Sequence, residues 1–147
     1  LQQFMPYQMM SSIGNWARLR HSIVNITEQQ LLDLEADIND ILAEDCVSIH
    51  FTFHAAFERL NDPRNSPSIT LNELGNVFQA FIQAHLHTIL DYAEGTCFVL
   101  KCNKSHLHFP CAISHDRQLG KLWVIQNVIT VMRKKNFKSP DHFLTIN

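Results

Sequence analysis

Residues 121–132, KLWVIQNVITVM, form a long and nearly all-apolar run. Such a run is typical of a β-strand covered on both faces, because neither face has to meet water. It is much shorter than the roughly 18–20 apolar residues of a membrane-spanning helix, so we expect no membrane partner. A strand of this kind needs strands at its edges and packed layers on its faces. The run therefore predicts a sheet in which 121–132 is central.

Two further strands are predicted directly before this run. TCFVLKC and HLHFPCAIS are separated by the turn NKS, and HDRQLG forms the next turn. Pro110 places the second strand near an edge or a bulge, since proline cannot donate to a ladder. Short turns join antiparallel neighbours. We therefore predict a three-stranded antiparallel meander over residues 95–132, with a helix packed across it.

The stretch CVSIHFTFH alternates apolar and polar residues and leaves two structures open. It is compatible with a strand, which would add residues 46–53 to the sheet. A helix beginning near Thr52 and running through HAAFERLND is the alternative. Pro63 ends either element, because the residue before a proline avoids helical geometry.

Two helices are predicted by their first turns. Thr27 with Gln30, and Thr70 with Glu73, have the spacing of a capping box, in which each side chain bonds the backbone of the other residue. Apolar residues then recur with helical period after each box. The first helix is acidic on its outer face, and the second is predicted over residues 70–92.

Helices thus precede strands along the chain, which predicts an α+β fold with N-terminal helices packed on a small antiparallel sheet. We divide the chain into an N-terminal helical arm and acidic helix, residues 1–45, and an α+β domain, residues 46–147. The apolar residues of segment 1–20 predict a helical arm that packs on the domain or on a neighbouring protein.

Charge is distributed unevenly along the chain. Residues 1–62 carry three cations against nine anions, whereas residues 63–147 carry nine cations against five anions. The second part therefore predicts a basic surface that attracts an acidic or phosphorylated partner. The alternative is that these cations pair with the acidic helix of the first part.

No metal or other cofactor is predicted. The hairpin sequence CFVLKCNKSHLHFPC contains ligand types that zinc accepts, but their spacing fits no common structural zinc motif. Side chains alternate along a strand, so Cys97 and Cys102 are expected on opposite faces. His106 and His108 share a face. The cysteines match no disulfide framework, and we expect reduced thiols.

The candidate site combines a histidine with several cations. His54 and Glu58 share one face if their segment is helical. A metal-free ribonuclease uses a proton-transfer group and cations that offset charge on the phosphorane. We predict His54, Arg64, Thr130 and Arg133 as catalytic residues, and Arg59, Lys134 and Lys135 as binding residues. In this prediction, His54 is the acid or base, and Arg64 and Arg133 are phosphate clamps. The alternatives are that Arg59 holds its helix through an ion pair and that Thr130 satisfies the sheet edge.

Parts of the chain resemble a family of small phage-encoded domains. The pattern of histidine, Glu-Arg and Asn-Asp-x-Arg-Asn in HAAFERLNDPRNSPSITLNELGNVF is similar to the first helix of barnase/EndoU/colicin/RelE-like domains, related in fold to RelE and ParE toxins. CFVLKCNKSHLHFPCAI, LWVIQNVITVMRKKNF and the terminal LTI resemble the family's sheet. The resemblance covers about residues 50–147. The family's helix histidine sits three residues before the glutamate, where this chain has Ala55, and His54 is one residue earlier. Thr130 lies where the family often has a threonine.

The resemblance implies a phage-derived domain that binds RNA, with the hypothesis that it is a metal-independent endoribonuclease. The alternative is a non-enzymatic virion structural or assembly protein that retains a degenerate nuclease-like fold. The expected partners are RNA or, through the arm 1–20, other virion proteins. The expected location is the host cytoplasm or the virion.

Overall fold

The computed structural model describes residues 25–147, so the predicted arm 1–20 lies outside the described residues. In chain order, the elements are α3 (Glu28–Leu42), η1 (Ala43–Asp45), β1 (Val47–Phe51), η2 (His54–Arg59), α4 (Leu71–Leu90), β2 (Cys97–Cys102), β3 (Leu107–Gln118), β4 (Lys121–Val128), β5 (Met132–Arg133) and β6 (His142–Ile146).

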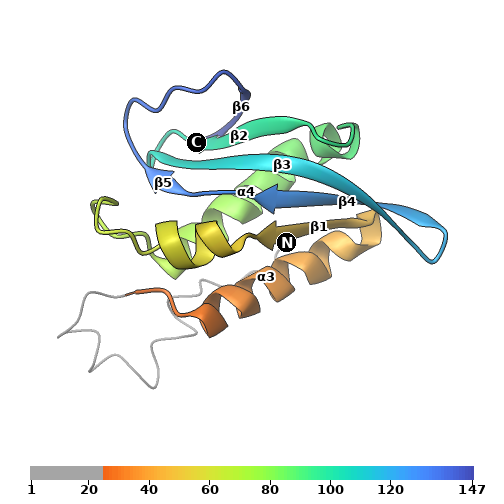
Figure 1. Ribbon diagram of the computed structural model, residues 1–147, viewed down its shortest axis with the longest axis horizontal. Helices are drawn as coiled ribbons and strands as arrows, with labels where there is room; N and C mark the ends of the chain where they lie inside the picture. The colour runs from red at the N-terminus through yellow and green to blue at the C-terminus, as the bar shows by residue number, and fades with distance from the viewer. Residues whose placement is uncertain (1–24) are drawn as a thin grey trace.

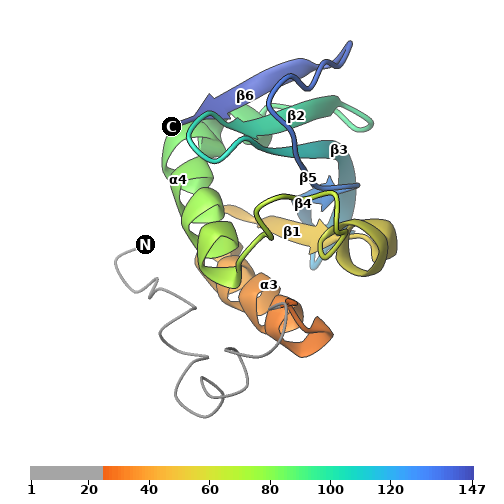
Figure 2. The same cartoon turned by 90° about the vertical axis from the view of Figure 1, so that its left-hand side faces the viewer.

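The strands form one sheet in the order β1-β4-β3-β2-β6, and the short β5 pairs with β3 beyond the end of β4. β2, β3 and β4 make the predicted antiparallel meander, and β4 lies inside the sheet between β1 and β3. α4 crosses one face, and α3 lies along the β1 side (Figures 1 and 2). The α+β fold class is therefore confirmed.

The sheet is mixed rather than purely antiparallel, which corrects the prediction. β1 pairs with β4 in parallel, and β6 pairs with β2 in parallel. The strand interpretation of residues 46–53 is thus correct up to Phe51, and a helical turn follows it. Hydrophobic alternation reports which residues share a face. It does not report strand direction, which depends here on the connections that bring the first and last strands to the meander.

The predicted strand 121–132 is interrupted. β4 ends at Val128, and pairing resumes at Met132 in β5. Pro110 of β3 faces this break: its carbonyl accepts a hydrogen bond from the Ile129 backbone at 2.9 Å. Proline has no backbone N–H that could donate a hydrogen bond back to this segment, so the β3–β4 hydrogen-bond ladder ends here. Pro110 therefore marks a break inside the sheet, and Thr130 lies within that break.

The core lies between α4 and the sheet. Phe78 of α4 packs against Phe109 of β3, with ring centroids 5.1 Å apart, and Phe81 stacks near Phe98 of β2 at 6.4 Å. All four rings are fully buried. Edge and offset contacts of this kind add to the free energy gained from burying apolar surface. The meander and α4 therefore form one packed unit that supports the loops at its ends.

α3 closes the free edge of β1. The Asn39 side chain accepts from the Ile49 backbone N–H at 2.7 Å and donates to the Ile49 carbonyl at 3.0 Å. Glu35 accepts from the Phe51 N–H at 2.7 Å. The edge groups are thus satisfied without a further strand, which removes a template for pairing with another chain. The acidic helix also contributes three buried leucines and one isoleucine to the same core as the sheet.

The other face of the sheet is partly covered by the segment between β5 and β6 (Figure 2). His108 of β3 is buried there, with its ring 5.0 Å from Phe137 and 6.2 Å from Phe143. Its Nδ1 donates to the His106 carbonyl at 3.0 Å. Its buried Nε2 has no hydrogen-bond partner among residues 25–147. Burial lowers the pKa of His108. The hydrogen bond to the His106 carbonyl offsets part of this shift, and the charges of Lys101 and His106 add to it.

Replacing His108 by leucine is expected to reduce the acid sensitivity of the fold. The unfolded chain binds a proton at His108 near pH 6.5, whereas the folded chain, with its lowered pKa, binds it only at lower pH. This contribution to stability is therefore complete above pH 6.5 and is lost as pH falls toward the folded pKa. Each pH unit between the unfolded and folded pKa values corresponds to about 1.4 kcal/mol of unfolding free energy. Urea unfolding at pH 7.5 and 5.0 measures the difference.

His87→Leu, at an exposed position of α4, is the matched control. It should lose as much unfolding free energy between pH 7.5 and 5.0 as the wild type does. An equal loss in the wild type and His108→Leu would show that His108 does not cause it.

Candidate functional site

The turn after β1 is a π-helix, η2, which spans His54–Arg59. Leu60 N–H donates to the Ala55 carbonyl at 2.9 Å, the i to i+5 bond of this geometry. Ala55 is buried, so the turn packs on the core through a small side chain. π-helical turns are rare and occur frequently at functional sites.

His54 is held between two charged side chains of this turn. Its Nδ1 lies 2.9 Å from Glu58 Oε1, and its Nε2 accepts from Arg59 Nε at 3.1 Å. A carboxylate only accepts and a guanidinium only donates. The neutral ring therefore carries its proton on Nδ1 and presents a basic Nε2. The side chain is 42% exposed.

Asp62 links the two arginines of this region. Its carboxylate accepts from Arg64 Nη2 at 2.7 Å and from Arg59 Nη1 at 3.4 Å. The hydrogen bonds from Arg64, first from its side chain and then from its backbone, hold the pKa of Asp62 well below its usual range. Arg64 is nevertheless 75% exposed. Its guanidinium is oriented by Asp62 and is accessible to a ligand. Arg59 forms an ion pair with Asp62, which is the kind of contact named in the alternative interpretation of Arg59.

Asn65 brings two distant segments together. Its amide donates to the Arg59 and Leu60 carbonyls at 2.9 and 3.3 Å, and its oxygen accepts from the Arg133 backbone at 3.0 Å. Asn65 is buried, so these bonds replace its hydration. The end of η2 is thereby fixed beside β5. Asn65 is the last residue of the Asn-Asp-x-Arg-Asn pattern. That pattern could have indicated Asn65 as a site residue, but the site predicted from the sequence did not include it.

A cavity of about 540 Å³ lies between these segments. Its lining residues are His54, Arg59, Asp62, Arg64, Asn65, Thr130, Val131, Met132, Arg133 and Lys134. Six of the seven predicted site residues line it. We refer to it as the His54 cavity. Four of its lining residues are permanent cations and one, Asp62, is an anion.

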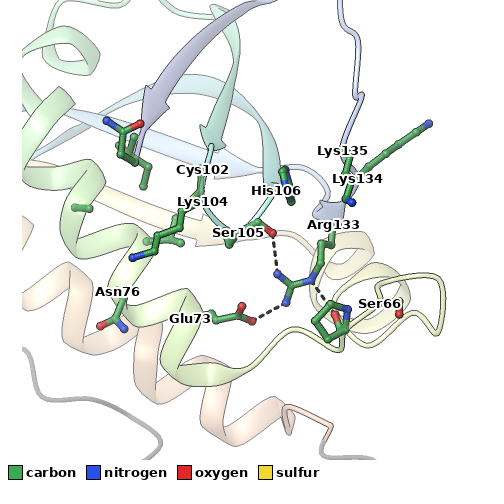
Figure 3. A pocket seen from close by; sticks show the side chains of 15 residues that line it. Ser66, Glu73, Asn76, Cys102, Lys104, Ser105, His106, Arg133, Lys134 and Lys135 are labelled. Atoms are coloured by element: carbon green, nitrogen blue, oxygen red, sulfur yellow. Dashed lines mark hydrogen bonds and ion pairs between the residues drawn. The ribbon is translucent and has the colours of Figure 1, made fainter.

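The side chain of Arg133, which the sequence predicts as a phosphate clamp, is buried. Its side chain is only 7% exposed. Its guanidinium donates to the carbonyls of Pro67 (2.8 Å), Ser68 (3.2 Å) and Ser105 (2.8 Å) and to Glu73 Oε2 (2.7 Å), as Figure 3 shows in part. Through these hydrogen bonds Arg133 ties β5 to α4 and to two loops.

A second cavity, of about 640 Å³, shares Arg133 and Lys134 with the first (Figure 3). Its apolar part is lined by Val77, Ala80, Cys102 and Ile146. Lys104, Lys134 and Lys135 are the lysines of its lining. Lys135 thus lies at this second cavity and not at the His54 cavity. Lys134 and Lys135 are exposed.

The described residues offer no cluster for a metal. Within residues 25–147, no three His, Cys, Asp or Glu side chains are gathered in a group that could hold an ion. Cys97 is exposed, whereas Cys102 and Cys111 are buried. Burial raises the pKa of Cys111 to about 12, so this thiol stays protonated.

Searches against protein-family models, curated proteins and solved structures found no significant match for this chain. None of the helices in the part of the chain that the structure describes is long and apolar enough to span a membrane.

Proposed function

We propose that this domain binds RNA by holding its phosphates at the His54 cavity. The observation that carries the proposal is the convergence of Arg59, Arg64 and Lys134, from two segments far apart in sequence, on one open cavity. Phosphate diesters are bound by such cations, and Arg64 presents a planar fork that fits phosphate oxygens. RNA, rather than another polyanion, is favoured by the resemblance to RelE-like domains.

The surface continues beyond this cavity. Arg133 is neutralised by Glu73, and Asp62 offsets the charge of Arg64 in part. Lys134 lines both cavities, and Lys104 and Lys135 extend the positive charge into the second one. An RNA strand that passes over Lys134 would therefore meet cations of both cavities.

Charge reversal tests the proposal. Lys134→Glu and Arg64→Glu are each expected to weaken binding of a fluorescent RNA oligonucleotide about tenfold, equally for different sequences, because phosphate contacts carry no base information. Each change should also reduce the slope of log Kd against log salt by about one. Fluorescence anisotropy at several salt concentrations measures both quantities.

Arg117→Glu is the matched control, because Arg117 is an exposed cation on the β3–β4 hairpin and lies outside both cavities. It makes the same charge change and should leave affinity unchanged. Absence of salt-sensitive RNA affinity in the wild type contradicts the proposal. If charge reversal instead disrupts self-association or particle assembly, the cations form a protein-docking site, as in the alternative of a virion structural protein.

RNA cleavage is a second candidate function, favoured by the contacts of His54. Glu58 holds Nδ1–H and would stabilise the imidazolium that forms when Nε2 takes a proton. In this hypothesis, phosphate draws Arg59 away from Nε2, which then removes the 2′-hydroxyl proton. The 2′-oxygen attacks phosphorus, the bond to the 5′-oxygen breaks, and water supplies the proton that this oxygen needs. The products are a 2′,3′-cyclic phosphate and a 5′-hydroxyl.

A further inference from the structure

Phe53 and Phe57 form an exposed aromatic pair in the same turn as His54, which lines the His54 cavity. Their side-chain rings stack with centroids 4.6 Å apart and an interplanar angle of 27°. The residues are 69% and 51% exposed, whereas Phe78, Phe81, Phe98 and Phe109 are fully buried. Phe53 directly precedes η2 and Phe57 lies within it. We call these two rings the Phe53/Phe57 pair.

Packing among residues 25–147 does not explain the pair. Each ring covers only part of the other, and the buried side of η2 is occupied by Ala55. Exposed apolar groups that adjoin polar residues commonly mark a binding surface. Here the neighbouring residues in sequence are His54 and Glu58, which form their own pair one residue further along the same turn. The aromatic pair and the His54–Glu58 pair therefore lie on adjacent stripes of one short helix.

We propose that the Phe53/Phe57 pair is a stacking surface for unpaired bases of an RNA strand whose phosphates lie at the His54 cavity. This inference rests on the proposed function and specifies its substrate as single-stranded RNA. Proteins that bind single strands combine a basic surface that follows the backbone with aromatic rings on which bases stack. In a duplex the bases stack on one another and cannot reach such rings.

Charge favours a nucleic-acid strand over a protein as the occupant. A stable protein interface buries more than about 1,000 Å² around an apolar centre depleted of charged residues. The Phe53/Phe57 pair is a small apolar surface, and the charged side chains of Glu58, Arg59 and Arg64 lie in or just beyond the same turn. A base with an attached phosphate matches this combination of ring faces and cations.

The test compares aromatic and aliphatic replacements. Phe57→Leu keeps an apolar side chain but removes the ring face, and is expected to weaken binding of a single-stranded RNA oligonucleotide about tenfold. Phe57→Trp should restore wild-type affinity, because any ring face accepts a base. The salt dependence should be unchanged in both variants, since neither removes a phosphate contact. Phe53→Leu and Phe53→Trp should behave in the same way.

Two controls accompany these variants. Leu122→Ala removes an exposed apolar side chain from the start of β4 and should leave affinity unchanged. A duplex of the same sequence should bind more weakly than the single strand and should be insensitive to Phe57→Leu. Circular dichroism verifies folding, which these exposed substitutions should preserve.

The outcomes separate this inference from the proposed function. If the wild type binds RNA in a salt-sensitive way but Phe57→Leu binds equally well, the stacking surface is refuted and phosphate binding stands. If duplex and single strand bind alike, the substrate assignment is refuted. If the wild type shows no RNA affinity, both proposals fail. If Phe57→Leu instead abolishes self-association and leaves RNA binding intact, the pair is a protein contact.

Discussion

Arg133→Met is expected to destabilise the domain by about 3 kcal/mol. The guanidinium donates to three backbone carbonyls and to Glu73, and its removal leaves these partly buried acceptors without this donor. Methionine fills the volume of the aliphatic stem but donates no hydrogen bond. Urea unfolding, monitored by circular dichroism, measures the loss as a shift of the midpoint.

Arg133→Lys should recover only a small part of this loss, because a single ammonium group cannot reproduce a planar fork with several acceptors. Lys134→Met, at the exposed neighbouring position, is the matched control and should change stability by less than about 0.5 kcal/mol. An unchanged midpoint in Arg133→Met, together with loss of RNA binding, would contradict this structural role and support the phosphate-clamp role predicted from the sequence.

His54→Ala is expected to reduce RNA cleavage by about 10²- to 10⁴-fold, the usual contribution of a general acid or base. Binding should change little, because a proton-transfer group acts mainly in the transition state. The measurement is single-turnover cleavage of labelled RNA in EDTA, with identification of the 2′,3′-cyclic phosphate end. Glu58→Gln should have a smaller effect, since the amide still accepts from Nδ1–H but no longer offsets the imidazolium charge.

The control for this experiment is His87→Ala, at an exposed histidine of α4 outside both cavities. RNA that stays intact with the wild type would limit the domain to binding. Equal cleavage by the wild type and His54→Ala would assign the chemistry to another group.

The starts of the helices were predictable because they depend on residues three apart. Both capping boxes form as expected: Thr27 accepts from the Gln30 backbone, and Thr70 accepts from the Glu73 backbone, each at 3.1 Å. The antiparallel meander was predictable for a similar reason, since short turns join its strands. Local hydrogen bonds and side-chain alternation suffice for these features.

The strand directions at the two sides of the sheet were not predictable in this way. β1 pairs with β4, and the partner residues Val47 and Val124 are far apart in the chain. The chain between these two residues includes α4, β2 and β3. A local pattern carries no information about such a pairing, because the same alternation fits either direction.

The candidate site likewise combines features that the sequence predicts with features that only the folded structure shows. The sequence alone specifies which residue types lie near His54 and at the end of the apolar run, and from it Lys134 and Lys135 are predicted as binding residues. The folded structure was needed to show that Asn65 joins these segments and that Arg133 is buried against Glu73, which is distant in the chain. This is because the role of an arginine depends on which acceptors surround its guanidinium. For Arg133 these acceptors come from α4 and from loops that meet it only after folding.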